Sequence, residues 1–477
     1  MDFASIVIFL ALYHIRPQEW IGIAPKLHLF ELTMLVAISS MVVKYRREGS
    51  FLGNLFRTPH DWIVLIYFCW LVGSAPNVGA TFLDVYSHLF FYLVTVQALS
   101  KIERIQTYLN WWTFFIVLIA GLAVASEFGF DPVNSSYDLT HGRMMGRLVL
   151  NTSIFNNPNA LGHSIVPAVV MLYFQCFWNR PVFSKVATFP LMILPLYCIY
   201  LTSSKGAYVS GFATVVTALT YRRPIIVQGL VFLVAFSGGW AGMQLLPRMG
   251  ELENAKGDGG IQGRLAAFQH GLTILKTDRN GVGYRLFVPS FDAVNRYTKG
   301  AHSSYVQVGA ELGYPGLILF LAILYCCLRT LITAKTVDVA QERVRRILFV
   351  LLISFLVSSW MIGWSYRATF FLMVASIAAF HRLLLASART ADVLEPSIAK
   401  TDKSSLTISG LDPNAEKPSL PEKIPTPDPT IATSPENATI TPSVGIRWNR
   451  FGWIDVVAII TMTVLTIKFW QFIMRHI

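Results

Sequence analysis

Charged side chains are scarce in this sequence. Asp, Glu, Lys and Arg make up only 14% of its 477 residues, whereas 54% are hydrophobic and the mean hydropathy is +0.51. Soluble domains carry about 25% charged residues. The shortage of charge therefore excludes an ordinary soluble enzyme and favours a protein whose helices cross a lipid bilayer.

Cysteines and clustered carboxylates are also few. The five cysteines all fall inside apolar stretches without the spacing of metal ligands, so neither a disulfide framework nor a zinc site is expected. No carboxylate pair has acid–base spacing in the long loops, and no acidic cluster there resembles a magnesium site. The carboxylates are instead scattered, at Asp131, Asp138, Asp258, Asp278 and Asp292. The sequence thus predicts chemistry that uses neither a metal nor another cofactor.

Long apolar runs are what the sequence has instead. Strands of a membrane barrel would appear as short alternating segments, so continuous runs indicate helices. If each span takes about 20 residues, the sequence predicts an all-α integral membrane protein with about 12–13 transmembrane helices. The runs are 2–15, 28–43, 61–75, 81–99, 108–125, 160–178, 186–202, 206–221, 225–246, 314–330, 347–364, 368–385 and 453–472.

The net charge of +12 would suggest a nucleic-acid partner in a soluble protein. Here the basic residues fall in short loops on alternate sides of the predicted spans, where they set the orientation in the bilayer. We therefore expect the lipid bilayer and no nucleic acid as a partner. With the N-terminus in the cytoplasm, the basic cytoplasmic loops are 44–60, 100–107, 179–185, 221–224 and 328–346.

The chain divides into three parts by composition. Residues 1–386 form the predicted membrane domain, with two long extracytoplasmic loops at 126–159 and 247–313. Residues 387–450 are rich in Pro, Ser and Thr and poor in aromatics, so they predict a disordered cytoplasmic linker. A last transmembrane helix is expected within 451–477.

The first polar stretch at the membrane edge is "GRMMGRLVLNTSIFNNPNALGHS", residues 142–164. Asn156 and Asn159 flank Pro158 where an apolar helix begins, and Asn and Pro are both typical of a helix start. A helix N-terminus at the membrane surface also binds anions readily, and Arg143 and Arg147 lie just before it. Capping and anion binding both remain open for this stretch.

The second stretch, "LTSSKGAYVSG", joins two apolar runs too closely for anything except a tight hairpin. Lys205 therefore lies at the extracytoplasmic boundary of the membrane. It is either a lysine that extends its amine to the interface or a cation directed at a phosphate.

The third stretch is "GGIQGRLAAFQHGLTILKTDRNGVGYRLF", residues 259–287. Arg264, Phe268, Leu272 and Leu275 recur at helical spacing, which predicts a surface helix with Arg264 near its start. The glycines of "GVGYRLF" predict a turn. They are weak evidence for nucleotide binding because no βαβ unit surrounds them.

The fourth stretch is "AHSSYVQVGAELGYPG", residues 301–316. His302 precedes a helical run that places Tyr305, Val308 and Leu312 on one face. A lone histidine in a loop is more often structural than catalytic, although its ordinary pKa suits a general base. Glu311 either orients His302 or only caps and hydrates the helix, and the second role is the simpler one.

Taken together and in this order, the four stretches resemble the O-antigen ligase superfamily of bacterial O-antigen ligases, some O-antigen polymerases and protein O-oligosaccharyltransferases. The resemblance rests on "SIFNNPNALG", "LTSSKGA", "GRLAAFQHGLTILKTDRNGVGYRLF" and "HSSYVQVGAELGYPGLILF". It covers 142–320, and the last two motifs are the most specific. The opening "HIRPQEWIG" is also similar to ligase-like proteins found near exopolysaccharide loci.

This resemblance implies a GT-C-like glycosyltransferase of the bacterial inner membrane with its active site facing the periplasm. The donor would be a glycan on a polyprenyl, usually undecaprenyl, pyrophosphate. The acceptor would be the lipid A–core of lipopolysaccharide, another glycan or a protein hydroxyl. Ligase, repeat-unit polymerase and protein O-oligosaccharyltransferase are all consistent with it.

Three residues of this chain match the family's functional positions. The catalytic histidine falls on His302 and the loop arginine on Arg264. The hairpin arginine falls on Lys205, which keeps the charge but lacks the planar fork that suits phosphate. Arg143 or Arg147 could supply that fork. The family's His-Asn pair is His-Ser here, because Ser303 follows His302.

The expected mechanism is an in-line transfer with inversion. Fixed cations stabilise the negative charge that builds on the pyrophosphate, and His302, with a pKa near neutrality, takes the proton of the attacking hydroxyl. A flippase or other transporter of lipid-linked glycans is the alternative from another class. It would place charged residues along a path through the spans, and few are found, at Glu31, Asp84 and His88.

Overall fold

The computed structural model of the chain describes residues 2–21, 28–48, 54–135, 146–245, 259–404, 445–446 and 448–476. Within these ranges every regular element is helical, apart from one isolated bridge between Lys335 and Gly445. The elements are α1 (Asp2–Ile15), α2 (Pro17–Trp20), α3 (Leu29–Glu48), α4 (Pro59–Gly73), α5 (Val78–Ala98), α6 (Ile102–Glu127), α8 (Pro158–Leu172), η2 (Tyr173–Phe177), α9 (Val182–Leu201), α10 (Lys205–Thr220), α11 (Ile225–Leu245), α12 (Gly259–Thr277), α13 (Phe287–Asn295), α14 (Ser304–Thr333), α15 (Val339–Ser358), α16 (Ala368–Ser404) and α17 (Trp453–His476).

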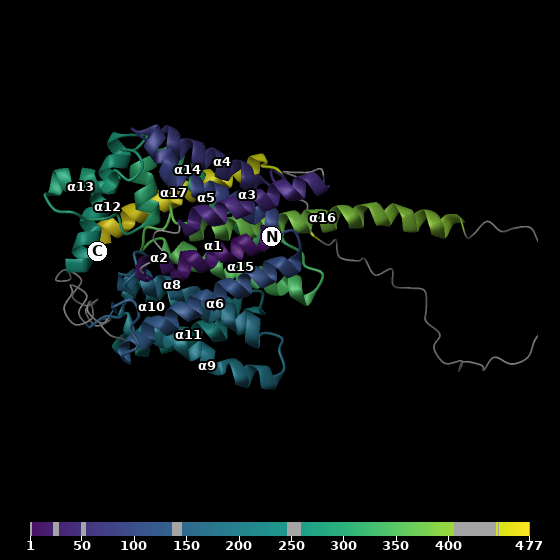
Figure 1. Cartoon of the computed structure of the whole chain (residues 1–477), viewed down its shortest axis with the longest axis horizontal. Helices are drawn as coiled ribbons and strands as arrows, with labels where there is room; N and C mark the ends of the chain where they lie inside the picture. Colours follow the sequence, from purple (N-terminus) through teal and green to yellow (C-terminus); the bar gives the residue numbers. More distant parts are fainter. Residues whose placement is uncertain are drawn as a thin grey trace, which may run out of the picture.

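The long helices run roughly along one axis of the molecule (Figure 1). The short helices α12 and α13 lie at one end, together with the C-terminal end of α17. The N-terminus lies toward the other end, beyond which α16 extends. The second long loop of the sequence is thus partly helical and forms one end of the bundle.

The predicted fold class, an all-α integral membrane protein, is confirmed, but the predicted number of spans is not. Seven described helices are long and apolar enough to cross a membrane, namely α5, α6, α8 continued by η2, α9, α14, α16 and α17. Shorter apolar helices cover Leu29–Val43, Pro59–Gly73 and Ile225–Gly239. The other predicted runs fall on helices such as α1 and α10, of 14 and 16 residues. These are shorter than the roughly 20 residues that a span requires.

The predicted boundary of the linker also differs. The run 368–385 continues as one helix, α16, to Ser404, so the backbone of 387–404 is helical. The part of the predicted linker at 405–444, and residue 447, lie outside the described residues.

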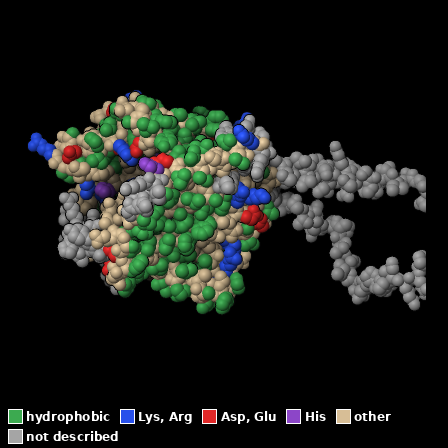
Figure 2. All heavy atoms as spheres, viewed as in Figure 1, with side chains coloured by type: hydrophobic (Ala, Val, Ile, Leu, Met, Phe, Trp, Pro, Cys, Tyr) green, Lys and Arg blue, Asp and Glu red, His purple; other side chains and the backbone are tan. Residues whose placement is uncertain are grey.

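The outer surface carries large apolar side chains that a soluble protein would bury. Phe183 on α9 and Ile226 and Leu233 on α11 are each more than 65% exposed. Figure 2 shows a broad apolar band across the body, with charged side chains gathered toward its two ends. In a chain with several helices apolar enough to cross a membrane, such an exposed apolar band is a membrane-facing surface.

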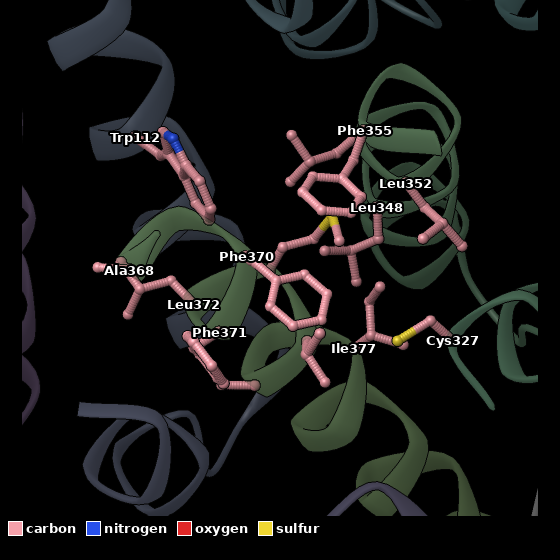
Figure 3. Packing of buried hydrophobic residues seen from close by; sticks show 14 of the residues in the cluster. Trp112, Cys327, Leu348, Leu352, Phe355, Ala368, Phe370, Phe371, Leu372 and Ile377 are labelled. Carbon is pink, nitrogen blue, oxygen red and sulfur yellow. The ribbon is translucent and has the colours of Figure 1, made fainter. Parts of the chain in front are cut away.

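The core is built from aromatic and branched side chains of several long helices. Figure 3 shows Phe370 of α16 between Phe355 of α15 and Ile377. The ring of Trp112 of α6 faces the same cluster. The rings of Phe355 and Phe370 stack with centroids 5.1 Å apart. This packing fixes α15 and α16 against each other, and with them the loop that joins the two helices.

A break in α14 anchors the predicted "GVGYRLF" turn. Pro315 has no backbone N–H, so the carbonyl of Glu311 loses its helical donor and accepts instead from Gly283 N at 2.8 Å. Gly313 at the break has a left-handed φ of 64°, and a Cβ there would lie 2.1 Å from Arg279 O. Only glycine fits this close approach, which holds the end of α12 on α14.

The C-terminal helix α17 holds α12 from the other side. Trp470 is fully buried, and its indole N–H donates to Phe268 O at 3.1 Å. Its ring occupies the space left by two glycines, since a Cβ on Gly271 or Gly309 would lie 3.1 or 3.3 Å from it. Trp470 therefore joins α17, α12 and α14.

We expect Trp470→Ala to lower the midpoint of thermal unfolding clearly, because removing a buried aromatic ring costs about 3–5 kcal/mol. Phe472→Ala is the matched control, since Phe472 lies on the same helix and is 54% exposed. Thermal unfolding of the purified variants measures both. Equal midpoints for the two variants would show that α17 does not hold α12.

Candidate active site

The first and second sequence stretches meet at the starts of α8 and α10. Asn157 is the N-cap of α8 and Pro158 its first residue, so the predicted capping role of this Asn-rich segment is confirmed. Asn159 Oδ1 accepts hydrogen bonds from Arg147 Nη2 at 3.1 Å and Ser204 Oγ at 2.8 Å. Arg147 Nε also donates to Thr202 O at 3.0 Å. Arg147 thus ties the segment before α8 to the hairpin.

The hairpin itself places Lys205 at the first position of α10. Ser204 is the N-cap, and its hydroxyl accepts from Ala207 N at 3.3 Å. The tight turn predicted for this stretch is present, with Ser203 at a left-handed φ of 49°. Lys205 therefore lies at the N-terminus of α10, where backbone N–H groups and the helix dipole favour an anion.

A glycine on α8 allows the hairpin to lie this close. A Cβ on Gly162 would lie 2.8 Å from Ala207 Cβ and 2.9 Å from Thr202 Oγ1, both on or beside the hairpin. No larger residue fits there without moving α10 and Lys205 with it.

We expect Gly162→Ala to destabilise the protein by about 1–3 kcal/mol through overpacking and to reduce activity. Gly211→Ala is the control, because the new Cβ would lie 3.8 Å from Val166 Cγ2, an ordinary contact. Both variants gain the same helix propensity, so the difference between their unfolding midpoints reports the clash alone. A Gly162→Ala protein as stable as Gly211→Ala would contradict the close packing described.

His302 occupies a strained position at the start of α14. Its φ is 48°, a left-handed conformation in which histidine is more frequent than most residues. Ser303 is the N-cap of α14, and Ser304 N donates to Ser359 O at 2.7 Å. Ser304 Oγ also donates to Ile362 O at 3.0 Å. The residues after His302 are thus fixed to the α15–α16 loop.

Two cations lie within electrostatic reach of His302. Burial and, to a smaller extent, the charges of Arg264 and Lys299 together lower the pKa of His302 to about 4. Arg264 likewise adds to the burial that lowers the pKa of Lys299. The expectation of a near-neutral pKa is therefore wrong for the unliganded protein. The sequence could not show this, because it does not show that His302 is partly buried beside two positive charges.

His163 on α8 connects this region to the hairpin. Its Nδ1 lies 2.9 Å from Ser358 Oγ and 3.3 Å from Ser210 Oγ, while its buried Nε2 has no hydrogen-bond partner among the described residues. A Cβ on Gly206 would lie 2.8 Å from that Nε2. The charge of Arg264 acts on His163 as well as on His302. All four sequence stretches therefore converge on one region.

The α15–α16 loop, residues 359–367, completes this region and was not singled out from the sequence. A Cβ on Gly206 would lie 2.9 Å from Met361 Sδ. Trp364 N donates to Ser304 Oγ at 2.9 Å, and the Trp364 ring lies 6.0 Å from that of His163. The predicted apolar run 347–364 included most of this loop, so its only signal was the polar and aromatic composition of "SWMIGWSYR".

The remaining candidate residues make contacts with groups other than His302 or lie outside the described part. Asn156 is exposed, and its N–H donates to Thr152 O at 2.8 Å. Tyr305 is buried, and its hydroxyl donates to Leu356 O at 3.0 Å, so it holds α14 on α15. Glu311 is buried, and its carboxylate accepts from Phe287 N at 3.3 Å and Gln307 Nε2 at 3.5 Å. Arg143 lies outside the described residues.

Positively charged and histidine side chains gather on the surface at one end of the bundle. Figure 2 shows Lys, Arg and His side chains around a hollow at the end where Figure 1 places α12 and α13. Fixed positive charges beside a neutral histidine can stabilise an anionic leaving group and accept a proton from a nucleophile.

Comparison with known proteins relates part of the chain to one described family. No curated protein matches the chain. Residues 190–321 match the model of the family described as O-antigen ligase. The match spans the hairpin with Lys205, the helix with Arg264 and the segment with His302, so it covers three of the four stretches. The resemblance to the O-antigen ligase superfamily that the motifs indicated is thereby confirmed across residues 190–321.

Proposed function

We propose that the protein transfers a glycan from a polyprenyl pyrophosphate to an acceptor hydroxyl, as an O-antigen ligase does. The family match supports a membrane glycosyltransferase of the ligase or polymerase type. The donor, the acceptor, the periplasmic location and the roles of single residues are our proposal. The observation that carries it is the meeting of His302, Arg264 and the Lys205 hairpin at one end of an apolar bundle.

The donor pyrophosphate lies between the cations in this proposal. Arg264 is within reach of His302, while the hairpin presents Lys205 at a helix N-terminus. Arg147 holds the hairpin in place through its hydrogen bonds to Asn159 and Thr202. The lipid tail of the donor would extend along the apolar outer surface, which leaves the sugar near His302.

The reaction balances without any further reactant. The acceptor oxygen attacks the anomeric carbon as the bond from that carbon to the pyrophosphate oxygen breaks, which inverts the configuration. The proton of the acceptor hydroxyl passes to His302, and polyprenyl pyrophosphate leaves with the bonding electrons. The cations stabilise the charge that develops on it.

In this mechanism the low pKa of His302 rises when the donor binds. In the unliganded protein Arg264 and Lys299 repel a proton from the imidazole. A bound pyrophosphate brings negative charge to the same place, so the pKa of His302 rises when the donor binds. His302 therefore becomes a better base only in the complex that reacts.

Deletion of the gene in its host tests this function. We expect long glycan polymer to remain on its lipid carrier while none reaches the final acceptor, as for a ligase. Glycans are analysed by size and by what they are attached to. Single repeat units without long chains would instead show a polymerase, and donor accumulating on the cytoplasmic leaflet would show a flippase.

A further inference from the structure

A second polar region lies beside the candidate active site. It is a cavity of about 520 Å³, within the size range of small-ligand sites. Its wall includes Arg16, Arg285 and Arg367, together with Glu31 and Gln307. None of the residues singled out from the sequence as catalytic or donor-binding lines it.

The three arginines differ in their partners. Arg16 pairs with Glu19, and Arg285 Nη1 lies 3.0 Å from Asp84 Oδ2. Arg367 is exposed, and no ion pair joins it to a carboxylate in the described part of the chain. Each guanidinium has five N–H donors, so the paired arginines keep donors for a ligand, while Arg367 keeps its charge as well.

The remaining wall suits a sugar rather than an inorganic anion. Glu31 and Gln307 can accept and donate hydrogen bonds with hydroxyl groups. The rings of Tyr13, Tyr86 and Tyr366 supply apolar faces of the kind that line small-molecule sites. A hydroxyl-rich ligand with one acidic group matches this combination of donors, acceptors and rings.

The cavity adjoins the candidate active site through the α15–α16 loop. Gln307 lies just after His302 on α14, and a Cβ on Gly363 would lie 2.6 Å from its Oε1. A smaller cavity of about 60 Å³ has Arg367 in its wall too, and it reaches His163 and Trp364. Arg367 therefore stands where the two cavities meet.

We propose that this cavity binds the acceptor as a glycan that carries an acidic group, and that Arg367 pairs with that group. The proposal rests on the proposed glycosyl transfer, in which the donor occupies the cations near Lys205 and Arg264. The acceptor then approaches from the side of Gln307, toward His302. The acidic group is a carboxylate of a uronic acid or a phosphate on a sugar.

Binding of soluble probes to the purified full-length protein in lipid nanodiscs tests the proposal. The probes are a glucuronic acid–glucose disaccharide, its methyl ester, and a glucose disaccharide phosphorylated at the same position. Calorimetry should show an acidic probe bound at least tenfold more tightly than the ester. Whichever acidic probe binds more tightly identifies the source of the charge.

Variants locate the binding. Arg367→Ala should remove the preference for the acidic probe, and Arg367→Lys should keep part of it. Arg223→Ala is the control, since Arg223 is exposed on the loop before α11 and does not line the cavity. Equal binding of acid and ester, binding of none of the probes, or an unchanged preference in Arg367→Ala would overturn the proposal.

The same probes separate this proposal from the proposed function. His302→Ala should bind the acidic probe normally while its rate of glycan transfer falls by about 10²–10⁴-fold. If the wild-type protein bound the probe but released no polyprenyl pyrophosphate from any donor, the transfer would be refuted while the cavity remained a glycan site. If transfer occurred without probe binding, only the assignment of the acceptor site would fail.

Discussion

His302→Ala is expected to reduce glycan transfer by about 10²–10⁴-fold, the usual contribution of a general base. Among the candidate site residues named from the sequence, His302 is the one histidine. The positive charges of Arg264 and Lys299 act on it. Its position before the N-cap of α14 lets the variant keep the hydrogen bonds of Ser303 and Ser304 to the α15–α16 loop. Transfer is measured as product formed per minute by purified protein.

Two controls accompany this variant. His476→Ala removes an exposed histidine at the end of α17 and should leave transfer unchanged. Thermal unfolding should show that His302→Ala remains folded, because the left-handed backbone at this position costs alanine only a modest strain. A folded His302→Ala protein with wild-type rates would refute the role of His302.

Arg264→Gln is expected to lower transfer by about 10²–10³-fold, as for the loss of one group that stabilises charge in the transition state. It should also change the pH dependence. In the wild type His302 is neutral above its pKa of about 4, so kcat/KM should fall only in strongly acidic solution. Removing Arg264 removes one repulsive charge, which raises that pKa toward the ordinary 6.5 and moves the acid limb to higher pH.

Lys276→Gln is the matched control for Arg264→Gln. Lys276 lies on the same helix, in its last turn, and is exposed. Lys276→Gln should leave unchanged both the rate of transfer and the pH at which kcat/KM falls in acid. A further check is that the acid limb of kcat should lie above that of kcat/KM, because bound pyrophosphate raises the pKa of His302. An acid limb that stays at one pH in wild type and Arg264→Gln would contradict the proximity of the two groups.

Local features of the site could be predicted from the sequence. The helix that carries Arg264, the cap at Asn157 and Pro158, and the hairpin before Lys205 each depend on residues within one short segment. Capping, turn chemistry and helical periodicity operate over such distances. The four stretches, taken in this order, then allowed the resemblance to the ligase superfamily to be identified.

Features that depend on packing between distant segments could not be predicted. Ser210 and Ser358 meet at His163 although nearly 150 positions separate the two serines along the chain, and no motif marks the contact. The low pKa of His302 arises from burial and from the charges of Arg264 and Lys299, and no sequence pattern pointed to the burial or to Lys299. The cavity with Arg367 joins residues from α1 to α16, and each appears alone in the sequence.

The number of spans predicted from the sequence is not confirmed for a related reason. Apolar runs mark helices correctly, but the length of each helix is decided by its caps and by its neighbours. α1 ends at Ile15 before Arg16 and Pro17, and α10 ends at Thr220. A short apolar helix inside a bundle has the same composition as a short span, so composition cannot separate the two.

Transfer by the purified protein tests the central claim most directly. The protein in nanodiscs is mixed with an undecaprenyl-pyrophosphate-linked glycan and an acidic acceptor glycan, and both products are measured. We predict equal amounts of elongated acceptor and free undecaprenyl pyrophosphate in the wild type, and both products formed about 10²–10⁴-fold more slowly by the folded His302→Ala variant. Donor that remains intact with the wild-type protein, or equal turnover in both proteins, would contradict the glycosyl transfer and the role of His302.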